Sequence, residues 1–325
     1  MAKKLKDIKP LVIGIGVAGR RHLEAQLNLG IKTGVYTTNP QTAKSLKDQN
    51  NVIVFDNLEK AIDWSNLVHV CTPDDKHTEY VTLALKKGKA VLCEKSFTTS
   101  LKDAISLQHL AHKYNSTLIV GQNYRLTPSF LETRKRVKEG RLGTITGIET
   151  TYLHDRIEYQ KRAPLRKNQD FLYIAGSHAV DLACWVSNQS IVSVQATSEN
   201  ELSYHISVKF SSGLLGHIIL DATSPRSRDG TDLIVDGEKG QLVSHNKLDE
   251  LLFYQKGNKN PRSIKFANNK TLTTALEVKI VDNYLSGKLK SYEPLPEVDE
   301  ALNIIKILDA IQKSVSSGKS ESIIY

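Results

Sequence analysis

The sequence contains few cysteines and no long hydrophobic run. Its three cysteines, Cys71, Cys93 and Cys184, are odd in number and widely spaced, which argues against a disulfide framework and fits a reducing compartment. No apolar stretch approaches the roughly 18 to 20 residues that cross a bilayer. No apolar segment of signal-peptide type follows the charged N-terminus. We therefore expect a cytoplasmic protein that does not bind membranes.

The positive charge of the chain is not concentrated in any one segment. A net charge of +9 is compatible with nucleic-acid binding, but the lysines are scattered and no basic block interleaves with aromatic residues. This distribution argues against a nucleic-acid partner and favours an anionic small molecule. A length of 325 residues, with 40% hydrophobic and 24% charged residues, is typical of a globular protein with two domains.

The chain up to residue 124 alternates short apolar runs with helical segments. Such alternation is typical of βαβ units, which form a doubly wound parallel sheet with helices on both faces. The expected strands lie in LVIGIG, KTGVYT, NLVHVCT, AVLCEK and TLIVGQN. We expect residues 1–124 to form one α/β domain of this type.

Beyond Pro128 and one helix, the chain becomes rich in β-like segments. Alternation or β-branched enrichment predicts strands in TITGIETTYL, SIVSVQATS, SYHISVKF and LLGHIILDA. The turns SSG, at 211–213, and DGEKG, at 236–240, join adjacent strands and therefore predict an antiparallel sheet. A final helix is expected from about Val298, with one apolar stripe and Gly318 as its C-cap.

Three glycines, Gly14, Gly16 and Gly19, follow the first expected strand and open a helix. In this position the G-x-G-x-x-G pattern indicates a dinucleotide site. The first glycine permits a tight turn, the second lets the backbone approach a pyrophosphate, and the third lets helix and strand pack closely. Amides at the helix start would donate to the phosphates. The cofactor-binding residues expected here are Gly14, Gly16, Val17, Ala18, Gly19 and Arg20.

Arg20 and Arg21 stand near the start of this helix, where the helix dipole already places partial positive charge. A bound diphosphate would offset the dipole and make both arginines tolerable. The alternative at this point is a glycine-lined turn with solvated arginines.

The acidic residue that bonds the ribose 2′-hydroxyl of NAD is absent from the end of the second expected strand. Thr37, Thr38 and Asn39 stand there instead. No carboxylate would repel a 2′-phosphate, and the hydroxyls could bond one, so we expect NADP, with NAD as the alternative. No arginine is present to pair with that phosphate, and Lys44 is a candidate to replace it.

Three further stretches could carry chemistry: CTPDDKH from Cys71, LCEKSF from Leu92 and GSHAVDLACW from Gly176. The first two end expected strands, where ligands bind in open α/β sheets. The order G-x-G-x-x-G, T-P-x-x-x-H, E-K and G-S-H-x-x-D resembles the Gfo/Idh/MocA family of nicotinamide-dependent oxidoreductases. The resemblance covers nearly the whole chain, including GQNYR, DGEKG and the final helix.

This resemblance implies a Rossmann domain over residues 1–124 and an α/β domain over residues 125–325. The second domain has a large, mainly antiparallel sheet that often mediates oligomerisation in relatives, so we expect a homodimer or homotetramer. The resemblance also implies hydride transfer between the nicotinamide cofactor and a sugar-like alcohol or carbonyl.

Two residues match the chemical centre of the family. The resemblance places Lys95 between nicotinamide and substrate and makes His178 the active-site histidine, and either side chain can move the proton of the reacting hydroxyl. The remaining cofactor-binding residues that it implies are Thr72, Pro73, His77, Glu94, Lys95 and Asn123.

The chain departs from the family pattern at two positions. Ser96 occupies a position that is usually proline, and Ile174 stands where relatives often carry an aspartate. We expect Tyr173, Asp170 or Asp181 to take over the missing role, unless the substrate differs or catalysis is weak. A plain helix-surface carboxylate is the alternative for Asp181.

The segment His154–Lys167 holds five arginines or lysines against two acids. Arginine is the usual residue for binding carboxylate or phosphate, so this segment favours a sugar acid or a nucleotide sugar as substrate. A solvated loop is the alternative. The residues expected to bind substrate are Asp181, Arg125, Tyr173 and Arg156.

Two other functions remain open on the sequence. The fold could bind a dinucleotide or sugar as a sensor without turnover, or it could reduce an imine or a carbonyl that is not a sugar. The histidines do not show metal-ligand spacing, so we expect no metal. Cys93 in an expected strand and Cys184 in an expected helix are interpreted as small buried hydrophobes rather than nucleophiles.

Overall fold

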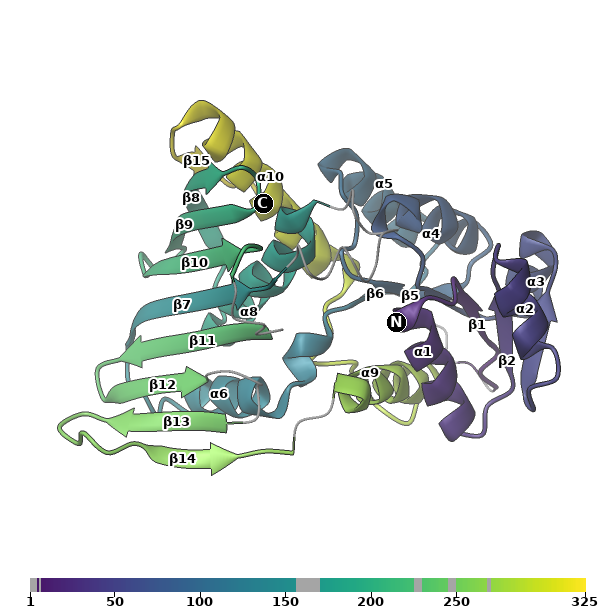
Figure 1. The fold of residues 1–325 in the computed structure, drawn as a ribbon, viewed down its shortest axis with the longest axis horizontal. Helices are drawn as coiled ribbons and strands as arrows, with labels where there is room; N and C mark the ends of the chain where they lie inside the picture. Colours follow the sequence, from purple (N-terminus) through teal and green to yellow (C-terminus); the bar gives the residue numbers. More distant parts are fainter. Residues whose placement is uncertain (1–4, 6, 156–169, 225–229, 245–249, 268–269) are drawn as a thin grey trace. The chain divides into compact units, whose positions relative to one another are not determined.

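The chain divides into two compact units, which are described separately (Figure 1). The first contains Met1–Asn123 and Asn269–Leu302, and the second contains Tyr124–Asn268 and Asn303–Tyr325. The computed structural model describes residues 5, 7–155, 170–224, 230–244, 250–267 and 270–325. Among the described helices, none combines the length and the hydrophobicity needed to cross a membrane.

A six-stranded parallel sheet forms the centre of the first unit, in the order β3-β2-β1-β4-β5-β6. This order confirms the expected Rossmann fold, and it places the topological switch between β1 and β4. Only the short strand β3 is missing from the expected set. The strands are β1 (Pro10–Ile13), β2 (Thr33–Tyr36), β3 (Val52–Phe55), β4 (Leu67–Val70), β5 (Ala90–Glu94) and β6 (Leu118–Gly121).

The helices that connect these strands start at polar residues. Asn39, Asn57 and Ser100 each accept a hydrogen bond from the backbone N–H three residues on, which satisfies one free amide at the start of a helix. Helix α1 differs, because its N-cap residue is Gly16 and no side chain caps it. The connecting helices are α1 (Val17–Asn28), α2 (Pro40–Leu46), α3 (Leu58–Trp64), α4 (His77–Lys86) and α5 (Leu101–Lys113).

Helix α9 (Lys270–Leu285) returns to the first unit, although it follows the strands of the second in the chain. It packs against α1, and Gln26 Nε2 of α1 donates to Asp282 Oδ1 of α9 at 3.1 Å. The structure therefore departs from a simple division at residue 124. The apolar residues of α9 form no single stripe, so the helix has no clear signal in the sequence.

A nine-stranded sheet forms the second unit, in the order β14-β13-β12-β11-β7-β10-β9-β8-β15. Its pair β7–β10 is parallel and every other neighbouring pair is antiparallel, which confirms the expected mainly antiparallel sheet. The strands are β7 (Ile145–Leu153), β8 (Ile191–Glu199), β9 (Ser203–Phe210), β10 (Leu215–Asp221), β11 (Gly230–Gly237), β12 (Gly240–Ser244), β13 (Glu250–Gln255), β14 (Arg262–Lys265) and β15 (Glu321–Ser322).

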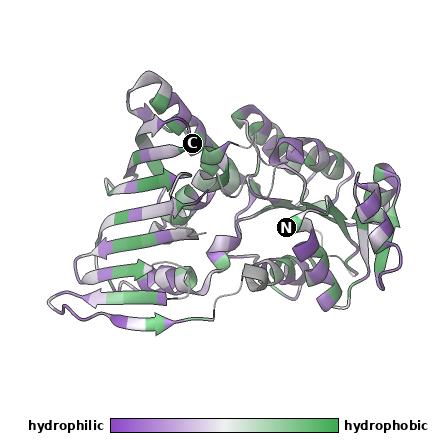
Figure 2. Cartoon of the chain, in the orientation of Figure 1, coloured by the Kyte–Doolittle hydropathy of each residue, from purple (hydrophilic) through white to green (hydrophobic). Residues whose placement is uncertain are grey.

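One face of this sheet is covered by helices of the same unit. Burial alternates along β9, where Tyr204, Ile206, Val208 and Phe210 are buried and the residues between them are exposed. Figure 2 shows hydrophobic residues along the strands of both sheets. The homo-oligomer expected through this sheet stays a prediction. The helices of the unit are α6 (Pro128–Lys138), α8 (Ser177–Ser187) and the C-terminal part of α10 (Val298–Ser317).

Asp282 makes the stability of the first unit depend on pH. Burial is the largest cause that raises its carboxyl pKa, from 3.8 to about 6. Between these two values the folded protein binds more protons than the unfolded chain, so the contribution of Asp282 to stability falls as the pH rises through this window.

We predict that Asp282→Asn stabilises the protein above pH 6 by up to about 3 kcal/mol, because the amide still accepts from Gln26 but carries no buried charge. Urea unfolding of both proteins at pH 3.5, 5 and 8 measures the difference. It should be near zero at pH 3.5 and largest at pH 8. A difference that does not vary with pH would contradict the raised pKa.

Candidate active site

The turn after β1 is shaped by two of its glycines. Gly14 has a φ of +86°, and a Cβ there would lie 2.9 Å from the carbonyl oxygen of Cys71. A Cβ on Gly19 would lie 1.9 Å from the carbonyl oxygen of Gly14. The tight turn expected of Gly14 and the close packing expected of Gly19 therefore both appear in the structure.

Gly16 and the start of α1 leave space and amide donors at this turn. No heavy atom lies within 4 Å of a Cβ built on Gly16. The first turn of α1 has no acidic residue, Val17 is 61% exposed, and the side chain of Arg20 is exposed as well. These features suit an anion approaching the amides of α1.

Two buried polar atoms near the carboxyl ends of the strands have no hydrogen-bond partner. They are the hydroxyl oxygen of Thr72, after β4, and the side-chain carbonyl oxygen of Asn123, after β6. Buried polar atoms normally find partners, so both point to a missing polar ligand. Together with the open space at Gly16, they show that the residues of this unit fit a dinucleotide.

Two of the residues after β2 make local hydrogen bonds at the start of α2. Asn39 Oδ1 accepts from the backbone N–H of Thr42 at 3.0 Å, and Thr37 Oγ1 accepts from the N–H of Asn39 at 3.3 Å. Thr38 is exposed. No carboxylate stands at this strand end, as the sequence shows.

Lys95 directly follows β5, and His77 supports the loop that carries it. The ring nitrogens of His77 lie 2.8 Å from the carbonyl oxygen of Ser96 and 3.0 Å from that of Thr72. His77 thus joins the loops after β4 and β5. Pro73, in the first of these loops, is exposed.

Glu94, the last residue of β5, is buried beside His22 of α1. His22 Nε2 lies 3.0 Å from Glu94 Oε1. Burial alone would raise the pKa of Glu94, but the hydrogen bond from His22 and nearby positive charge, including that of Lys95, outweigh it, so the pKa lies below its ordinary value. Glu94 is therefore a carboxylate at neutral pH.

No motif in the sequence indicates the groups around Glu94. His22 belongs to the helix after the glycine turn, and His69 of β4 lies in the expected strand NLVHVCT. Glu277 of α9 lay in a helix that had not been predicted. No spacing in the sequence links these residues, because three different elements bring them together.

His178 of α8 lies in a buried aromatic stack in the second unit. Its ring is stacked on Tyr124 with centroids 4.0 Å apart and parallel to Tyr152 at 6.3 Å. The side chain is 4% exposed. The stack holds the orientation of the imidazole ring.

Arg125 and Asp181 form a buried ion pair with two hydrogen bonds. Arg125 Nε donates to Asp181 Oδ2 at 2.9 Å and Nη2 donates to Oδ1 at 2.6 Å. The guanidinium also lies 5.7 Å from the ring of Trp185. Two of the four residues expected to bind substrate therefore bind each other in the structure.

Ile174 lies in a π-helix, Leu172–Gly176, that leads into α8. The two neighbours expected to replace the missing aspartate both bond Gln312 of α10. Tyr173 OH donates to Gln312 Oε1 at 3.3 Å, and Gln312 Nε2 donates to Asp170 Oδ2 at 3.1 Å. Burial raises the pKa of Tyr173 to about 12, so its phenol is neutral. Arg156 and most of the basic segment around it lie outside the described residues.

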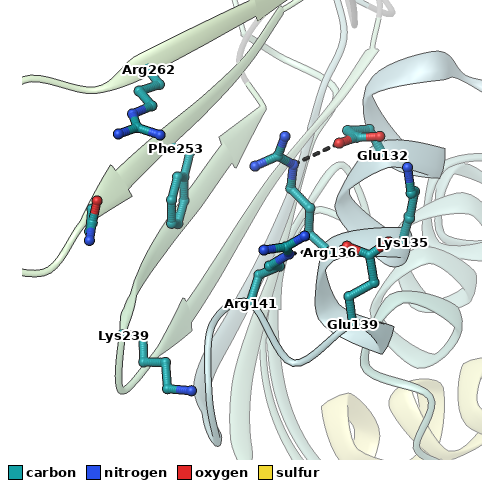
Figure 3. A pocket seen from close by; sticks show the side chains of 9 residues that line it. Glu132, Lys135, Arg136, Glu139, Arg141, Lys239, Phe253 and Arg262 are labelled. Atoms are coloured by element: carbon teal, nitrogen blue, oxygen red, sulfur yellow. Dashed lines mark hydrogen bonds and ion pairs between the residues drawn. The ribbon is translucent and has the colours of Figure 1, made fainter.

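A surface pocket in the second unit contains none of the predicted site residues (Figure 3). It lies between α6 and strands β13 and β14, and Arg136 bonds Glu132 while Arg141 bonds Glu139 within it. Phe253 stands opposite Arg262 in the sheet. The lining residues are Glu132, Lys135, Arg136, Glu139, Arg141, Lys239, Phe253, Gln255 and Arg262.

Two family profiles match the two parts of the chain. The profile described as "Oxidoreductase family, NAD-binding Rossmann fold" matches residues 8–122, and the "GFO/IDH/MocA C-terminal domain" matches residues 130–243. The chain belongs to the Gfo/Idh/MocA oxidoreductase family. The resemblance drawn from the motifs is thereby confirmed.

Curated members of the Gfo/Idh/MocA family match this chain at low to moderate identity. Inositol 2-dehydrogenase of Rhizobium meliloti is 24% identical over 292 residues, which cover 84% of each chain. An uncharacterized oxidoreductase of Schizosaccharomyces pombe is 31% identical over 192 residues, or 55% of this chain. That second match spans only 52% of the yeast protein.

Solved structures share the fold over nearly the whole chain. Levoglucosan dehydrogenase in complex with NADH and levoglucosan gives a TM-score of 0.86 at 17% identity, covering 98% of this chain and 100% of that one. The oxidoreductase domain protein from Kribbella flavida gives 0.85 at 20% identity, covering 99% and 100%. At these identities the likeness establishes the fold of this Gfo/Idh/MocA member.

We predict that alanine has a large effect on stability at one glycine of the turn and a small effect at another. Gly19→Ala should destabilise the protein by about 3 kcal/mol or more, because the new methyl group meets the Gly14 carbonyl. Gly16→Ala should change stability by less than about 1 kcal/mol, because Gly16 has a φ of −80° and open space around it. Chemical denaturation of both variants tests the contrast, and equal losses would refute it.

We predict that Asp181→Ala costs about 3–5 kcal/mol of stability, because it leaves the Arg125 guanidinium buried without its partner. Asp181→Asn retains an acceptor and should cost less. Thermal unfolding of the two variants measures this order. An Asp181→Ala protein as stable as the wild type would show that the pair contributes nothing to the fold.

Proposed function

We propose that this chain is a nicotinamide-dependent dehydrogenase that acts on a sugar-like or cyclitol alcohol. The observation that carries the proposal lies within the first unit. The Gly14–Gly19 turn, Thr72 and Lys95 follow β1, β4 and β5, which are neighbours in one parallel sheet. Their positions at one sheet edge suit a dinucleotide with its reactive end toward Lys95.

The residues that would hold the cofactor are those that the structure leaves open or unsatisfied. The amides from Gly16 onward would donate to the diphosphate, and Thr72 and Asn123 would bond its polar groups. When bound, the nicotinamide ring supplies the hydride acceptor or donor. The lack of a carboxylate after β2 supports NADP as the preferred form, with Thr38 as a donor to the 2′-phosphate.

Lys95 is the proposed residue at the reacting oxygen. In its ammonium form the side chain donates a hydrogen bond to a carbonyl oxygen and gives it a proton, and in its amine form it takes the proton of a hydroxyl. His178 is the second proposed proton-handling group, and its stacking on Tyr124 fixes the direction in which its ring nitrogens point.

The names of the relatives support the substrate class. Inositol and levoglucosan are cyclic polyols, and the dehydrogenases named for them match this chain along most of its length. We extend this class to sugars with an acidic group on account of the basic segment His154–Lys167. The Arg125–Asp181 pair is assigned a role in holding α8 rather than in direct substrate contact.

Ile174 favours a second candidate function. An apolar side chain where relatives carry an aspartate removes one polar group from the family pattern. A protein that binds dinucleotide or sugar without turnover, as a sensor, would tolerate this loss. Lys95 and His178 favour the enzyme, so the sensor is the alternative outcome of the test.

The test is a screen of the purified protein with NADP⁺ and NAD⁺ against cyclitols, sugars, sugar acids and nucleotide sugars, with absorbance of the reduced nicotinamide as the signal. We predict that Lys95→Ala lowers kcat/KM by about 10²–10⁴-fold, because it removes the group that handles the proton. Cofactor affinity, measured by titration, should change little. Thermal shifts should be larger with NADP⁺ than with NAD⁺.

The Gly16→Ala variant serves as the control for cofactor binding, because the variant should fold normally but its methyl group would block the approach of the diphosphate. It should lose the cofactor-induced thermal shift while its melting temperature without cofactor stays close to that of the wild type. Cofactor binding without turnover of any substrate would favour the sensor. A wild-type protein that neither cofactor stabilises would contradict both functions.

A further inference from the structure

A chain of buried polar groups in the first unit ends at Glu94, the residue that precedes Lys95. It joins four side chains of the sheet and α1 to two side chains of α9. Every member is buried, and none belongs to the cofactor-binding residues except Glu94. The members are Glu94 of β5, His22 and Gln26 of α1, His69 of β4, and Glu277 and Asp282 of α9.

The contacts along this chain are short and continuous. His22 Nε2 lies 3.0 Å from Glu94 Oε1, and His22 Nδ1 lies 2.9 Å from His69 Nδ1. His69 Nε2 lies 3.2 Å from Gln26 Nε2. The same Gln26 nitrogen donates to Asp282 Oδ1 at 3.1 Å. Each histidine therefore uses both ring nitrogens inside the protein.

Elementary donor rules fix where the hydrogens lie. The amide nitrogen of Gln26 can only donate, so Nε2 of His69 must accept and its hydrogen must lie on Nδ1. That hydrogen points at Nδ1 of His22, which must accept in turn. The remaining hydrogen of His22 lies on Nε2 and points at Glu94. Both histidines are then neutral, each in one tautomer.

Asp282 fixes the orientation of Gln26 at the far end. Turning the amide would place its oxygen against the Asp282 carboxylate, which also only accepts while it is ionised. Its pKa of about 6 leaves it ionised at pH 7 and above. Burial is the largest cause that lowers the pKa of His69, in agreement with a neutral ring.

Glu277 lies beside Glu94 but outside the chain of hydrogen bonds. Ligand atoms of Glu277, Glu94 and His22 lie within 4.8 Å of one another, and both Glu277 oxygens are buried without a partner. Two adjacent buried carboxyl groups ionise together only at high cost. Burial first, and then the charge of Glu94, raises the pKa of Glu277, so it is the protonated member.

We propose that His22 and His69 are positioning residues of the Lys95 site, which act through one ordered chain of hydrogens that ends on the Glu94 carboxylate. This inference rests on the proposed function of Lys95. The site then has one carboxylate next to Lys95 rather than two, with Glu277 as a neutral neighbour. A single anion beside Lys95 favours the ammonium form that hydrogen-bonds the reacting oxygen.

The same hydrogen order argues against a cation among His22, Glu94 and Glu277. A metal ligand must present a lone pair, but Nε2 of His22 carries a hydrogen in this arrangement. These hydrogen-bonded groups also cannot conduct a proton from Glu94 to Asp282, because the amide nitrogen of Gln26 only donates and cannot accept a proton as an imidazole nitrogen does. The chain of groups holds the Glu94 side chain in place and keeps it ionised.

The charged and titratable groups that face Glu94 come from every element packed around it. Lys95 and His77 lie toward the sheet edge, while Cys71 and Cys93 are buried thiols whose pKa values burial raises, so both are neutral. The others are the members of the chain named above.

Histidine-selective ¹⁵N NMR of the wild-type protein at pH 7.5 tests the hydrogen order without any need for activity. We expect two buried neutral rings, one with its hydrogen on Nε2 and one with its hydrogen on Nδ1, which His22→Gln and His69→Gln assign to His22 and His69. An imidazolium at either residue, or the reverse tautomers, would overturn the proposal. Metal analysis should find no stoichiometric cation, and finding one would overturn it too.

Kinetics test the role of the chain, with two matched pairs of variants. In His22→Gln the amide reaches the Nε2 position and still donates to Glu94, whereas in His22→Asn it reaches only toward His69. We expect His22→Asn to move the acidic limb of the kcat/KM profile up by about one pH unit, because Glu94 loses its donor, and His22→Gln to retain the wild-type limb. Identical limbs in the two variants would overturn the proposal.

The second pair applies one change to two touching carboxyl groups. Glu94→Gln should lower kcat/KM by about tenfold or more, because it removes the anion beside Lys95. Glu277→Gln, an isostere of the neutral acid, should stay within about twofold. Equal losses would overturn the assignment of charge. If the wild-type protein turns over no substrate, the proposed function fails while the NMR result still decides the hydrogen order.

Discussion

The close approach of α1 to β1 is the contact on which the first unit depends. The Cα of Gly19 lies against the carbonyl of Gly14 so closely that a Cβ would come within 1.9 Å of that oxygen. This approach places the start of α1 beside the carboxyl ends of β1 and β4. It directs the free amides of α1 at the sheet edge where Thr72 and Lys95 also lie, and it brings His22 and Gln26 over the sheet.

Burial of charge is the second constraint on this unit. Glu94, Glu277 and Asp282 are all buried, and the protein satisfies them differently. Glu94 stays ionised because a donor faces it, Glu277 stays protonated because none does, and Asp282 titrates near pH 6. The free-energy cost of burying these acids is thus limited, because only Glu94 is ionised beside Lys95.

The second unit uses its polar residues mainly to hold its helices. The Arg125–Asp181 pair joins the start of the unit to α8, and Gln312 joins α10 to the residues around Ile174. These contacts explain how α8 presents His178 in a fixed orientation. They also show that Arg125 and Asp181, two of the residues expected to bind substrate, bind each other, because a buried charge binds the nearest opposite charge.

The Rossmann unit, its glycine turn, the mainly antiparallel second sheet and the family could all be predicted from the residues, because strand–helix alternation and glycine conformations are local properties of the chain. The sequence did not reveal α9, whose apolar residues form no stripe, or β3, an edge strand whose four residues are all only partly buried. Which polar groups meet depends on the packing of the folded protein. His22, His69, Glu94 and Glu277 come from four separate elements, and their charges follow from burial and from the direction of each hydrogen bond, which depend on contacts between residues far apart in the chain.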